Sequence, residues 1–160
     1  MKKEIKLTWT HEQLATARKR RWPLADNSVD EMSVQNLVSM LTPAERIHFV
    51  NELWRVLKPG AKAQITTPHW CSSRAYSDLT FVYPPVAEGW YFHLNEAWRK
   101  ANAPWGKAYR CDFDITFGYG LHPHVVTRNQ EYQQHAVTFF KEAAQDVVAA
   151  LTKRKPVPVG

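Results

Sequence analysis

The segment from His69 to Asp78 holds the densest group of side chains that could carry out chemistry. His69 could act as a base, Arg74 could supply a fixed positive charge, and the rings of Trp70 and Tyr76 could stack on a bound molecule. We therefore take His69 and Asp78 as candidate catalytic residues, and all five as a candidate substrate or partner pocket. The alternative is an aromatic loop that fills the core, with a hydrogen-bonded histidine and a surface ion pair, which is the commoner role of aromatic-rich segments.

A metal site would have to draw on His69, Cys71, Cys111, His122 and His124. His122 and His124 would lie on one face of an extended chain, because side chains alternate along a strand. The sequence has neither the paired Cys-x-x-Cys nor the His-Glu-x-x-His spacing that zinc sites usually show. We therefore expect no metal, and we expect two reduced thiols rather than a disulfide framework.

Positive charge is concentrated in two short runs of the chain, whose formal net charge is +6. The runs are Arg18-Lys19-Arg20-Arg21 and Lys153-Arg154-Lys155. The first run, together with the aromatic residues between positions 90 and 105, could contact nucleic acid through phosphates and stacked bases. It could equally hold an acidic protein. The alternative is a solvated helix end and a solvated tail.

Glycine is scarce, with 6 residues in a chain of 160, and none precedes Gly60. Average usage of about 7% would give about 11 in this length. Backbone amides approach a phosphate closely only where the residues are small, so the first third of the chain holds no glycine-rich nucleotide loop. The one G-x-G sequence, Gly118-Tyr119-Gly120, follows a late strand and is expected to form a turn.

The elements that position these residues include one strong local signal, the sequence Thr-Pro-Ala-Glu at positions 42–45. Thr42 can cap a helix, Pro43 suits the first helical position, and Glu45 can reach back to the cap. Apolar residues then recur at helical spacing to Leu57, and the Lys-Pro-Gly sequence at 58–60 ends the helix. Strands are expected at 29–34, 61–67 and 112–119.

The remaining segments are less regular. Residues 10–20 predict a short basic helix that begins with a capping box, and residues 68–110 predict loops with one or two short helices. Thr127 predicts another helix start, after which one apolar face predicts a single long helix. The members of that face are Tyr132, Ala136, Phe139, Ala143, Val147 and Leu151.

Two segments carry a resemblance to a known family. Residues 22–31 read Trp-Pro-Leu-Ala-Asp-Asn-Ser-Val-Asp-Glu, and residues 49–60 read Phe-Val-Asn-Glu-Leu-Trp-Arg-Val-Leu-Lys-Pro-Gly. They resemble class I SAM-dependent methyltransferases, in which P-x-x-D-N-S-x-D leads into the fourth strand and E-x-x-R-V-L-K-P-G-G into the fifth. The match covers residues 22–70 well, and weaker similarity to small methyltransferase-like proteins of phages and bacteria extends beyond. The resemblance implies an α/β fold: a partial Rossmann-like methyltransferase sheet, with strands corresponding to the fourth to seventh, and flanking helices.

The sequence departs from this family before Trp22. In the family, the first strand and its glycine-rich loop hold the methionine part of SAM, and the second strand ends in an acidic residue that binds the ribose. Only 21 residues precede Trp22 here, whereas one strand–helix–strand unit needs about 30. After the fourth strand, residues 35–41 offer no carboxylate or imidazole as a general base. The resemblance therefore implies a truncated protein, with no cofactor expected unless a partner completes a SAM site.

A sheet without the family's first three strands would leave the strand at 29–34 with an open edge. Unpaired backbone groups on such an edge favour association with other chains. Three solutions are available: the segment Ile5 to Trp9 pairs as a replacement strand, the helix at 10–20 covers the edge, or a second chain docks there. We therefore predict a homodimer or a protein partner at the strand 29–34 edge.

Three functions follow for residues 1–155, which we expect to form one domain with a flexible tail at 156–160. The first is a degenerate methyltransferase-like protein that binds a protein or nucleic-acid partner; a phage-borne inhibitor or accessory protein fits its size. The second is an active methyltransferase whose SAM site is completed by a dimer mate or partner subunit, and the third is a nucleic-acid-binding module. No apolar run approaches the roughly 18 residues of a membrane helix, and no signal sequence is evident, so we expect a cytoplasmic protein.

Overall fold

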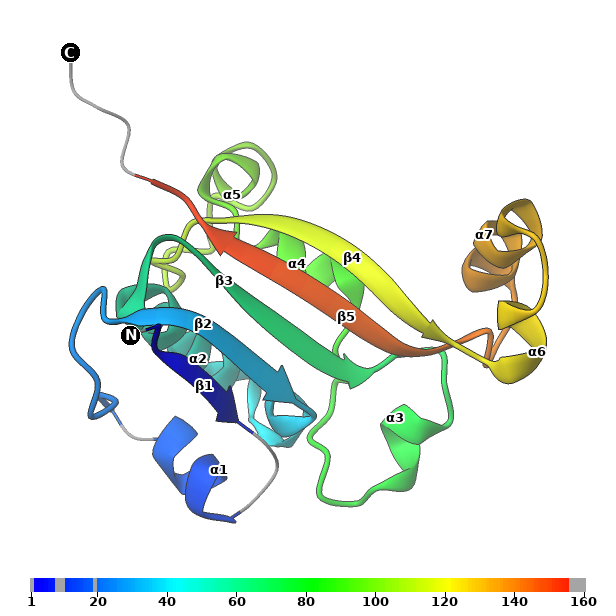
Figure 1. The fold of residues 1–160 in the computed structure, drawn as a ribbon, viewed down its shortest axis with the longest axis horizontal. Helices are drawn as coiled ribbons and strands as arrows, with labels where there is room; N and C mark the ends of the chain where they lie inside the picture. Colours follow the sequence, from blue (N-terminus) through cyan, green and yellow to red (C-terminus); the bar gives the residue numbers. More distant parts are fainter. Residues whose placement is uncertain (1, 8–10, 19, 156–160) are drawn as a thin grey trace.

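A mixed sheet of five strands runs through the computed structural model, which describes residues 2–7, 11–18 and 20–155 (Figure 1). The strand order is β1-β2-β3-β5-β4. Strands β1, β2 and β3 are parallel, whereas β5 runs antiparallel to both β3 and β4. The strands are β1 Glu4–Leu7, β2 Val29–Gln35, β3 Leu57–Pro68, β4 Phe113–Leu121 and β5 Ala144–Lys153.

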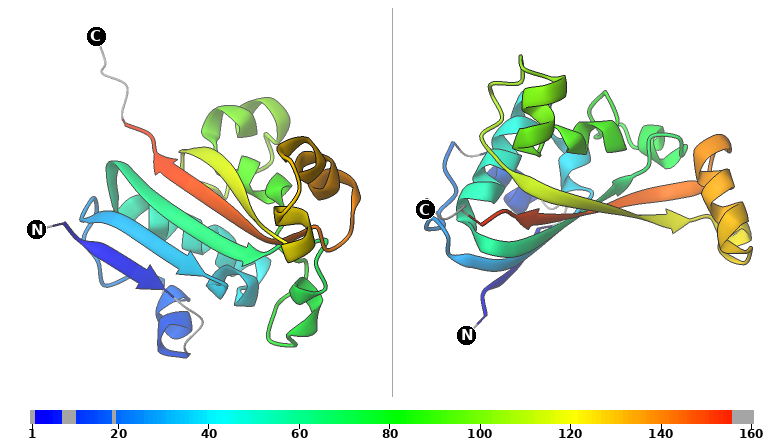
Figure 2. Two further views of the ribbon diagram at one scale, coloured as in Figure 1. Left: turned by 45° about the vertical axis from the view of Figure 1, so that its right-hand side comes forward. Right: turned by 90° about the horizontal axis from the view of Figure 1, so that it is seen from above.

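The helices connect these strands, and α2, α4 and α5 lie on one side of the sheet (Figure 2). None of the helices in the described residues is long and apolar enough to cross a membrane. The helices are α1 His11–Ala17, the 3₁₀ helix η1 Leu37–Met40, α2 Pro43–Val56, α3 Arg74–Ser77, α4 Glu88–Phe92, α5 Glu96–Asn102, α6 Pro123–Val126 and α7 Gln130–Phe139.

The sheet buries one face and leaves the other open to solvent. On the buried face, Met32, Ile65 and Leu151 pack with Phe49 and Leu53 of α2 in one core. Exposed polar side chains alternate with the buried ones along the strands. They include Glu31, Gln35, Lys62, Gln64, Asp114 and Thr116. Parallel strands covered on both faces are usually apolar throughout, so this alternation indicates a two-layer arrangement.

The helix start at Thr42 is confirmed. The Thr42 hydroxyl accepts a hydrogen bond from Glu45 N at 3.3 Å, and Glu45 Oε2 accepts one from Thr42 N at 2.8 Å. Helix α2 ends at Val56, and β3 begins at the next residue rather than at 61. Gly60 therefore lies inside β3, where its φ of +81° requires the conformational freedom of glycine.

The expected long helix through Leu151 is wrong. Helix α7 ends at Phe139, and residues 144–153 form β5, which lies between β3 and β4. Val147, Ala149 and Leu151 are buried and the residues between them are not, so a period of two competes with helical spacing in this stretch. Strand neighbours on both sides decide the outcome, because they supply partners for the backbone groups.

Three smaller expectations are also wrong. Asn129 rather than Thr127 caps α7, because its side chain accepts a hydrogen bond from Tyr132 N at 2.9 Å. The Gly118-Tyr119-Gly120 sequence lies within β4 and not in a turn. Three short helices, instead of one or two, occur between residues 68 and 110, namely α3, α4 and α5.

The strand at 29–34 has a neighbouring strand on each side and therefore no open edge. The prediction that a homodimer mate or protein partner docks on the strand 29–34 edge is therefore wrong. Strand β1 pairs with β2 in parallel, with Ile5 opposite Met32. Pairing of this segment with the strand at 29–34 is thus confirmed for residues 5–7. Thr8, Trp9 and the capping residue Thr10 lie outside the described residues. The edge position passes to β1, which carries the charged residues Glu4 and Lys6. Charged side chains on an edge disfavour pairing with another chain.

Candidate functional site

His69 directly follows β3, at the carboxyl end of the parallel strands, and its side chain is buried. Both ring nitrogens have partners. Nε2 lies 2.7 Å from Oε1 of Glu88, the first residue of α4, and Nδ1 lies 2.9 Å from Sγ of Cys71. A thiol, an imidazole and a carboxylate therefore form one hydrogen-bonded series, which we call the Cys71–His69–Glu88 relay.

The contacts of His69 fix its tautomer. The backbone N–H of Cys71 donates to Nδ1 at 3.3 Å, so Nδ1 carries the lone pair and Nε2 carries the proton donated to Glu88. Burial raises the pKa of Glu88, but hydrogen bonds to the carboxylate, with that from His69 the strongest, lower it further, to about 2. Glu88 is therefore ionised at neutral pH and can stabilise a positive charge on the imidazole.

Two aromatic side chains complete the surroundings of Glu88. Trp70 Nε1 donates to Oε2 at 3.2 Å, and the phenol of Tyr119 on β4 also hydrogen-bonds to the carboxylate. Burial and the neighbouring negative charge of Glu88 raise the pKa of Tyr119 to about 12, so the phenol keeps its proton. The rings of Trp70 and Tyr119 have centroids 5.6 and 5.8 Å from that of His69, so the imidazole is held from two sides.

The other three residues of the candidate pocket lie apart from the relay. Arg74 pairs with Asp146 of β5 at 2.8 Å, and Tyr76 is exposed. Asp78 accepts hydrogen bonds from the hydroxyl and the backbone N–H of Thr80, which lower the pKa of its carboxyl. Arg74 and Asp78 line a separate hollow of about 450 Å³ at the carboxyl ends of β2 and β3. Its other lining residues are Asn36, Pro68, Ser77, Leu79 and Phe81.

Sequence reasoning missed Cys71 and Glu88 as members of the site. The His-x-Cys spacing of residues 69 and 71 is a weak signal, which we considered only for metal binding. Glu88 lies 19 residues from His69 and carries no local signal, because only the fold of the 68–88 connection brings α4 onto the end of β3. Among the described residues, no group of three or more His, Cys, Asp or Glu side chains is arranged to hold a metal ion.

The basic run at residues 18–21 lies away from this site. Arg18 pairs with Glu45 at 3.0 Å and Arg21 pairs with Asp26 at 2.8 Å. Arg20 is exposed, and Lys19 lies outside the described residues. Two of the three described arginines are therefore engaged with carboxylates of the same chain, which reduces the positive charge available to an anionic partner.

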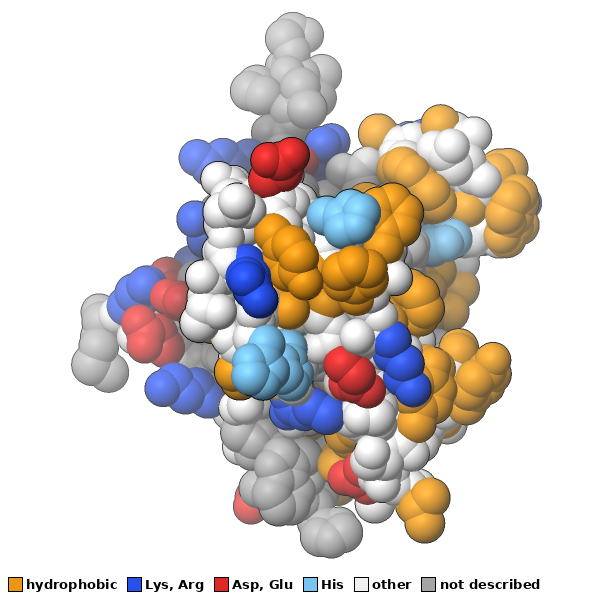
Figure 3. Space-filling model, turned by 90° about the vertical axis from the view of Figure 1, so that its right-hand side faces the viewer, with side chains coloured by type: hydrophobic (Ala, Val, Ile, Leu, Met, Phe, Trp, Pro, Cys, Tyr) orange, Lys and Arg blue, Asp and Glu red, His pale blue; other side chains and the backbone are white. Residues whose placement is uncertain are grey.

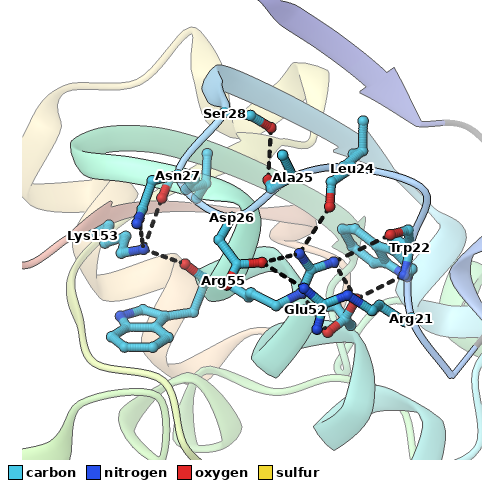
Figure 4. A network of polar contacts seen from close by, with 12 residues as sticks. Arg21, Trp22, Leu24, Ala25, Asp26, Asn27, Ser28, Glu52, Arg55 and Lys153 are labelled. Atoms are coloured by element: carbon cyan, nitrogen blue, oxygen red, sulfur yellow. Dashed lines mark hydrogen bonds and ion pairs between the residues drawn. The ribbon is translucent and has the colours of Figure 1, made fainter.

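The two segments that resemble methyltransferases contact each other (Figure 4). Arg55 donates to both oxygens of Glu52 at 2.9 and 2.7 Å and to Asp26 at 2.6 Å, and Glu52 accepts the backbone N–H of Trp22 at 2.8 Å. Lys153, the last residue of β5, joins this network, because its ammonium group donates hydrogen bonds to the Asn27 side chain and to two backbone carbonyls. This network precedes β2 and β3, so it lies at the opposite end of those strands from His69 and its role is structural.

Comparison with known proteins finds similarity in structure only. No protein-family model matches the chain, and no curated protein sequence matches it significantly. A SAM dependent methyltransferase from Archaeoglobus fulgidus superposes with a TM-score of 0.62 at 11% identity, over 95% of this chain and 86% of that one. An S-adenosylmethionine dependent methyltransferase from Mesorhizobium loti gives 0.56 at 9% identity, over 94% and 90%.

A third similar structure comes from a complex. It is the complex between the Haloferax volcanii Trm112 methyltransferase activator and the putative methyltransferase, with a TM-score of 0.54 at 11% identity, over 98% of this chain and 85% of that one. Together these structures establish that the chain has a Rossmann-like methyltransferase fold. At such low sequence identity, these similarities are evidence for a shared fold alone.

Proposed function

We propose that the protein is a degenerate methyltransferase-like protein that holds no SAM by itself and acts by docking on another protein. Strand β1 supports the first half of this proposal. It has four residues, and it occupies the outermost position of the sheet in the described part of the chain. The sequence that follows it, Thr8-Trp9-Thr10, contains no glycine. The backbone amides of residues with larger side chains approach a cofactor less closely than those of glycine do.

The proposal that the protein docks on another protein rests on one observation, the exposed apolar side chains at the carboxyl end of the parallel strands. The connection from β3 to α4 exposes Leu79 by 99% and Tyr83 by 80% of their surfaces, and Trp70 and Tyr76 are about half exposed. Figure 3 shows further apolar side chains over the same end of the molecule, where α6 and α7 lie. Exposed apolar groups of this kind mark protein–protein contacts, in which Trp and Tyr are enriched.

The Haloferax volcanii structure supports a protein partner, because the putative methyltransferase there is in complex with a Trm112 activator. The charged edge at β1 argues against pairing of two sheets, so the docking surface proposed is the 70–83 connection. Nucleic acid is the weaker alternative, since Arg18 and Arg21 already pair with Glu45 and Asp26.

Calorimetric titration of SAM into the purified chain tests the first half. We expect no binding heat at micromolar to submillimolar SAM; saturable binding in the micromolar range would overturn the proposal. The second candidate function, a methyltransferase completed by another subunit, is favoured by the hollow of about 450 Å³ beside β2 and β3, which falls within the size of ligand sites. It requires that SAM bind only after a partner is added.

Mass measurement in solution across a range of protein concentrations tests the docking surface. If the partner is a second copy, Leu79→Asp and Tyr83→Asp should abolish the dimer, whereas Gln64→Asp on the open sheet face should not. A monomer at all concentrations would mean that the partner is a different chain, to be sought with the same variants as controls. A dimer that all three variants leave intact would show that the 70–83 connection is not its interface.

A further inference from the structure

The geometry points to Cys71 as a nucleophilic thiol, activated by His69 and Glu88, that undergoes exchange with small disulfides. This inference does not depend on the proposed function, because it concerns the reactivity of one side chain and not the docking of a partner. It rests on the Cys71–His69–Glu88 relay, on the backbone groups around Cys71 and on the position of the second cysteine.

The relay has the order that thiol activation requires. A thiolate, not a thiol, is the nucleophile, and a nearby base that takes the proton increases the thiolate population. Sγ of Cys71 lies 2.9 Å from the unprotonated Nδ1 of His69. When Nδ1 takes the thiol proton, the resulting positive charge faces the ionised Glu88 at 2.7 Å. Cys71 is half-buried, so part of the residue remains accessible.

The backbone around Cys71 selects the class of electrophile. Acyl transfer develops a charged oxygen, which needs free N–H donors close to the nucleophile. The N–H of Cys71 donates to His69 Nδ1, that of Ser72 to His69 O, and that of Ser73 to Glu142. A disulfide needs no such donors, because the charge stays on sulfur throughout the exchange. Once Nδ1 is protonated it releases the N–H of Cys71, but those of Ser72 and Ser73 stay occupied. Of these three N–H groups only one is then left for a charged oxygen, which favours a disulfide over an ester or amide.

The step is balanced without a further reactant. The thiolate of Cys71 attacks one sulfur of the small disulfide, a new S–S bond forms, and the original S–S bond breaks. The departing thiolate takes the proton from Nδ1 of His69 and leaves as a thiol. One disulfide is consumed and one is formed, so no external oxidant is needed.

The second cysteine is placed where it cannot resolve the product. Cys111 is fully buried, and burial raises the pKa of its thiol to about 12. Sγ of Cys71 is near the carbonyl of Ala144, at the start of β5, while Cys111 precedes Phe113, which pairs with the last residue of β5. The strand between these points measures about 30 Å. The reaction therefore stops at a mixed disulfide, which an added thiol reverses.

Several charged groups face the relay from the elements packed around it. Besides Glu88 on α4 and the neutral Tyr119 on β4, Glu142 lies beside Cys71, because its backbone N–H donates to the Cys71 carbonyl at 3.4 Å. Its carboxylate is occupied by Ser72 and Ser73. Asp146 lies opposite Pro68 in the sheet, next to His69, and its charge is balanced by the ion pair with Arg74. The negative charge of Glu142 disfavours a thiolate at Cys71, whereas the His69–Glu88 pair favours it. Removing the charge of Glu88 therefore tests whether the pair activates the thiol.

Oxidised glutathione is the probe for the test, with the adduct followed by intact mass and located by peptide mapping. We expect one adduct, on Cys71, removed by dithiothreitol, absent in Cys71→Ser and unchanged in Cys111→Ala. Glu88→Gln keeps a hydrogen-bond acceptor without the charge, and should lower the rate of adduct formation at pH 7 about tenfold.

Circular dichroism must first show that Glu88→Gln retains the fold. If it does not, the wild-type protein decides: adduct formation at pH 7 no faster than that of a free cysteine derivative such as N-acetylcysteine is the behaviour of an ordinary thiol and overturns the proposal. An unchanged rate in folded Glu88→Gln, absence of an adduct, or equal labelling of Cys111 overturns it too. Stoichiometric release of nitrophenolate from p-nitrophenyl acetate, without reaction with glutathione disulfide, would reassign the thiol to acyl chemistry.

Discussion

Nη1 of Arg55 and Oδ1 of Asp26 lie 2.6 Å apart, and this contact joins the two sequence segments that resemble methyltransferases. The same guanidinium binds Glu52, which accepts the backbone N–H of Trp22. Hydrogen bonds to Glu52 and Asp26 outweigh the effect of partial burial and raise the pKa of Arg55. The two segments that resemble methyltransferases thus form a structural network at the amino ends of β2 and β3.

Arg55→Met should lower the free energy of unfolding by about 3–5 kcal/mol, because it leaves the buried carboxylate of Glu52 without its ionic partner. Urea denaturation measures the loss. Arg21→Met is the matched control, since Arg21 also binds Asp26 but is exposed to solvent, and we expect it to change stability little. Equal losses in the two variants would show that burial of the network contributes nothing.

Glu88 should make stability depend on pH between about 5 and 2. Its pKa in the folded protein is about 2, against 4.5 for the free side chain. A carboxyl with a lowered pKa stabilises the fold above its unfolded value, and that contribution, about 3 kcal/mol at most, is lost as the pH falls toward the folded value. The difference in unfolding free energy between the wild-type protein and Glu88→Gln should therefore shrink on acidification. A difference that stays constant with pH would contradict the hydrogen bond from His69 to the Glu88 carboxylate.

Ala149→Asp and Ala150→Asp distinguish the strand at residues 144–153 from a helix. Ala149 is fully buried on the covered face of β5, whereas Ala150 is on the open face. An unpaired carboxylate buried at position 149 should cost roughly 3 kcal/mol or more of unfolding free energy, and one at position 150 under about 1 kcal/mol. A helix with Val147 and Leu151 on its inner face would tolerate aspartate at 149, so two mild variants would contradict β5.

Asn129→Ala should lower the stability of α7 by about 1 kcal/mol, because it removes the side chain that accepts from Tyr132 N. Thr127→Ala is the control, as its hydroxyl donates to His124 O at 3.3 Å and does not cap α7. Amide hydrogen exchange of residues 130–139 reports the change locally. Greater exchange in Thr127→Ala than in Asn129→Ala would restore Thr127 as the start of the helix.

Local sequence signals predicted those elements whose causes are themselves local. The capping box at Thr42 depends on neighbouring residues, and it occurs where the sequence places it. The helix end expected at Lys-Pro-Gly does not, because α2 stops at Val56 and Gly60 lies inside β3. The strand at 29–34 and the methyltransferase-like α/β fold were likewise predictable. Pairing of the segment around Ile5 with that strand was one of three solutions that the sequence left open for its edge, and the structure selects it.

Tertiary structure alone decided the remaining features. Val147 and Leu151 fit both helical and strand periods, and only the strands on either side select β5. The relay joins Cys71 and His69, which are close in sequence, to Glu88, which is not. No local pattern encodes that meeting, because it depends on the path of the 68–88 connection and on the packing of α4 against the end of β3. The sequence by itself thus determined the fold class, while long-range packing decided which side chains can react together.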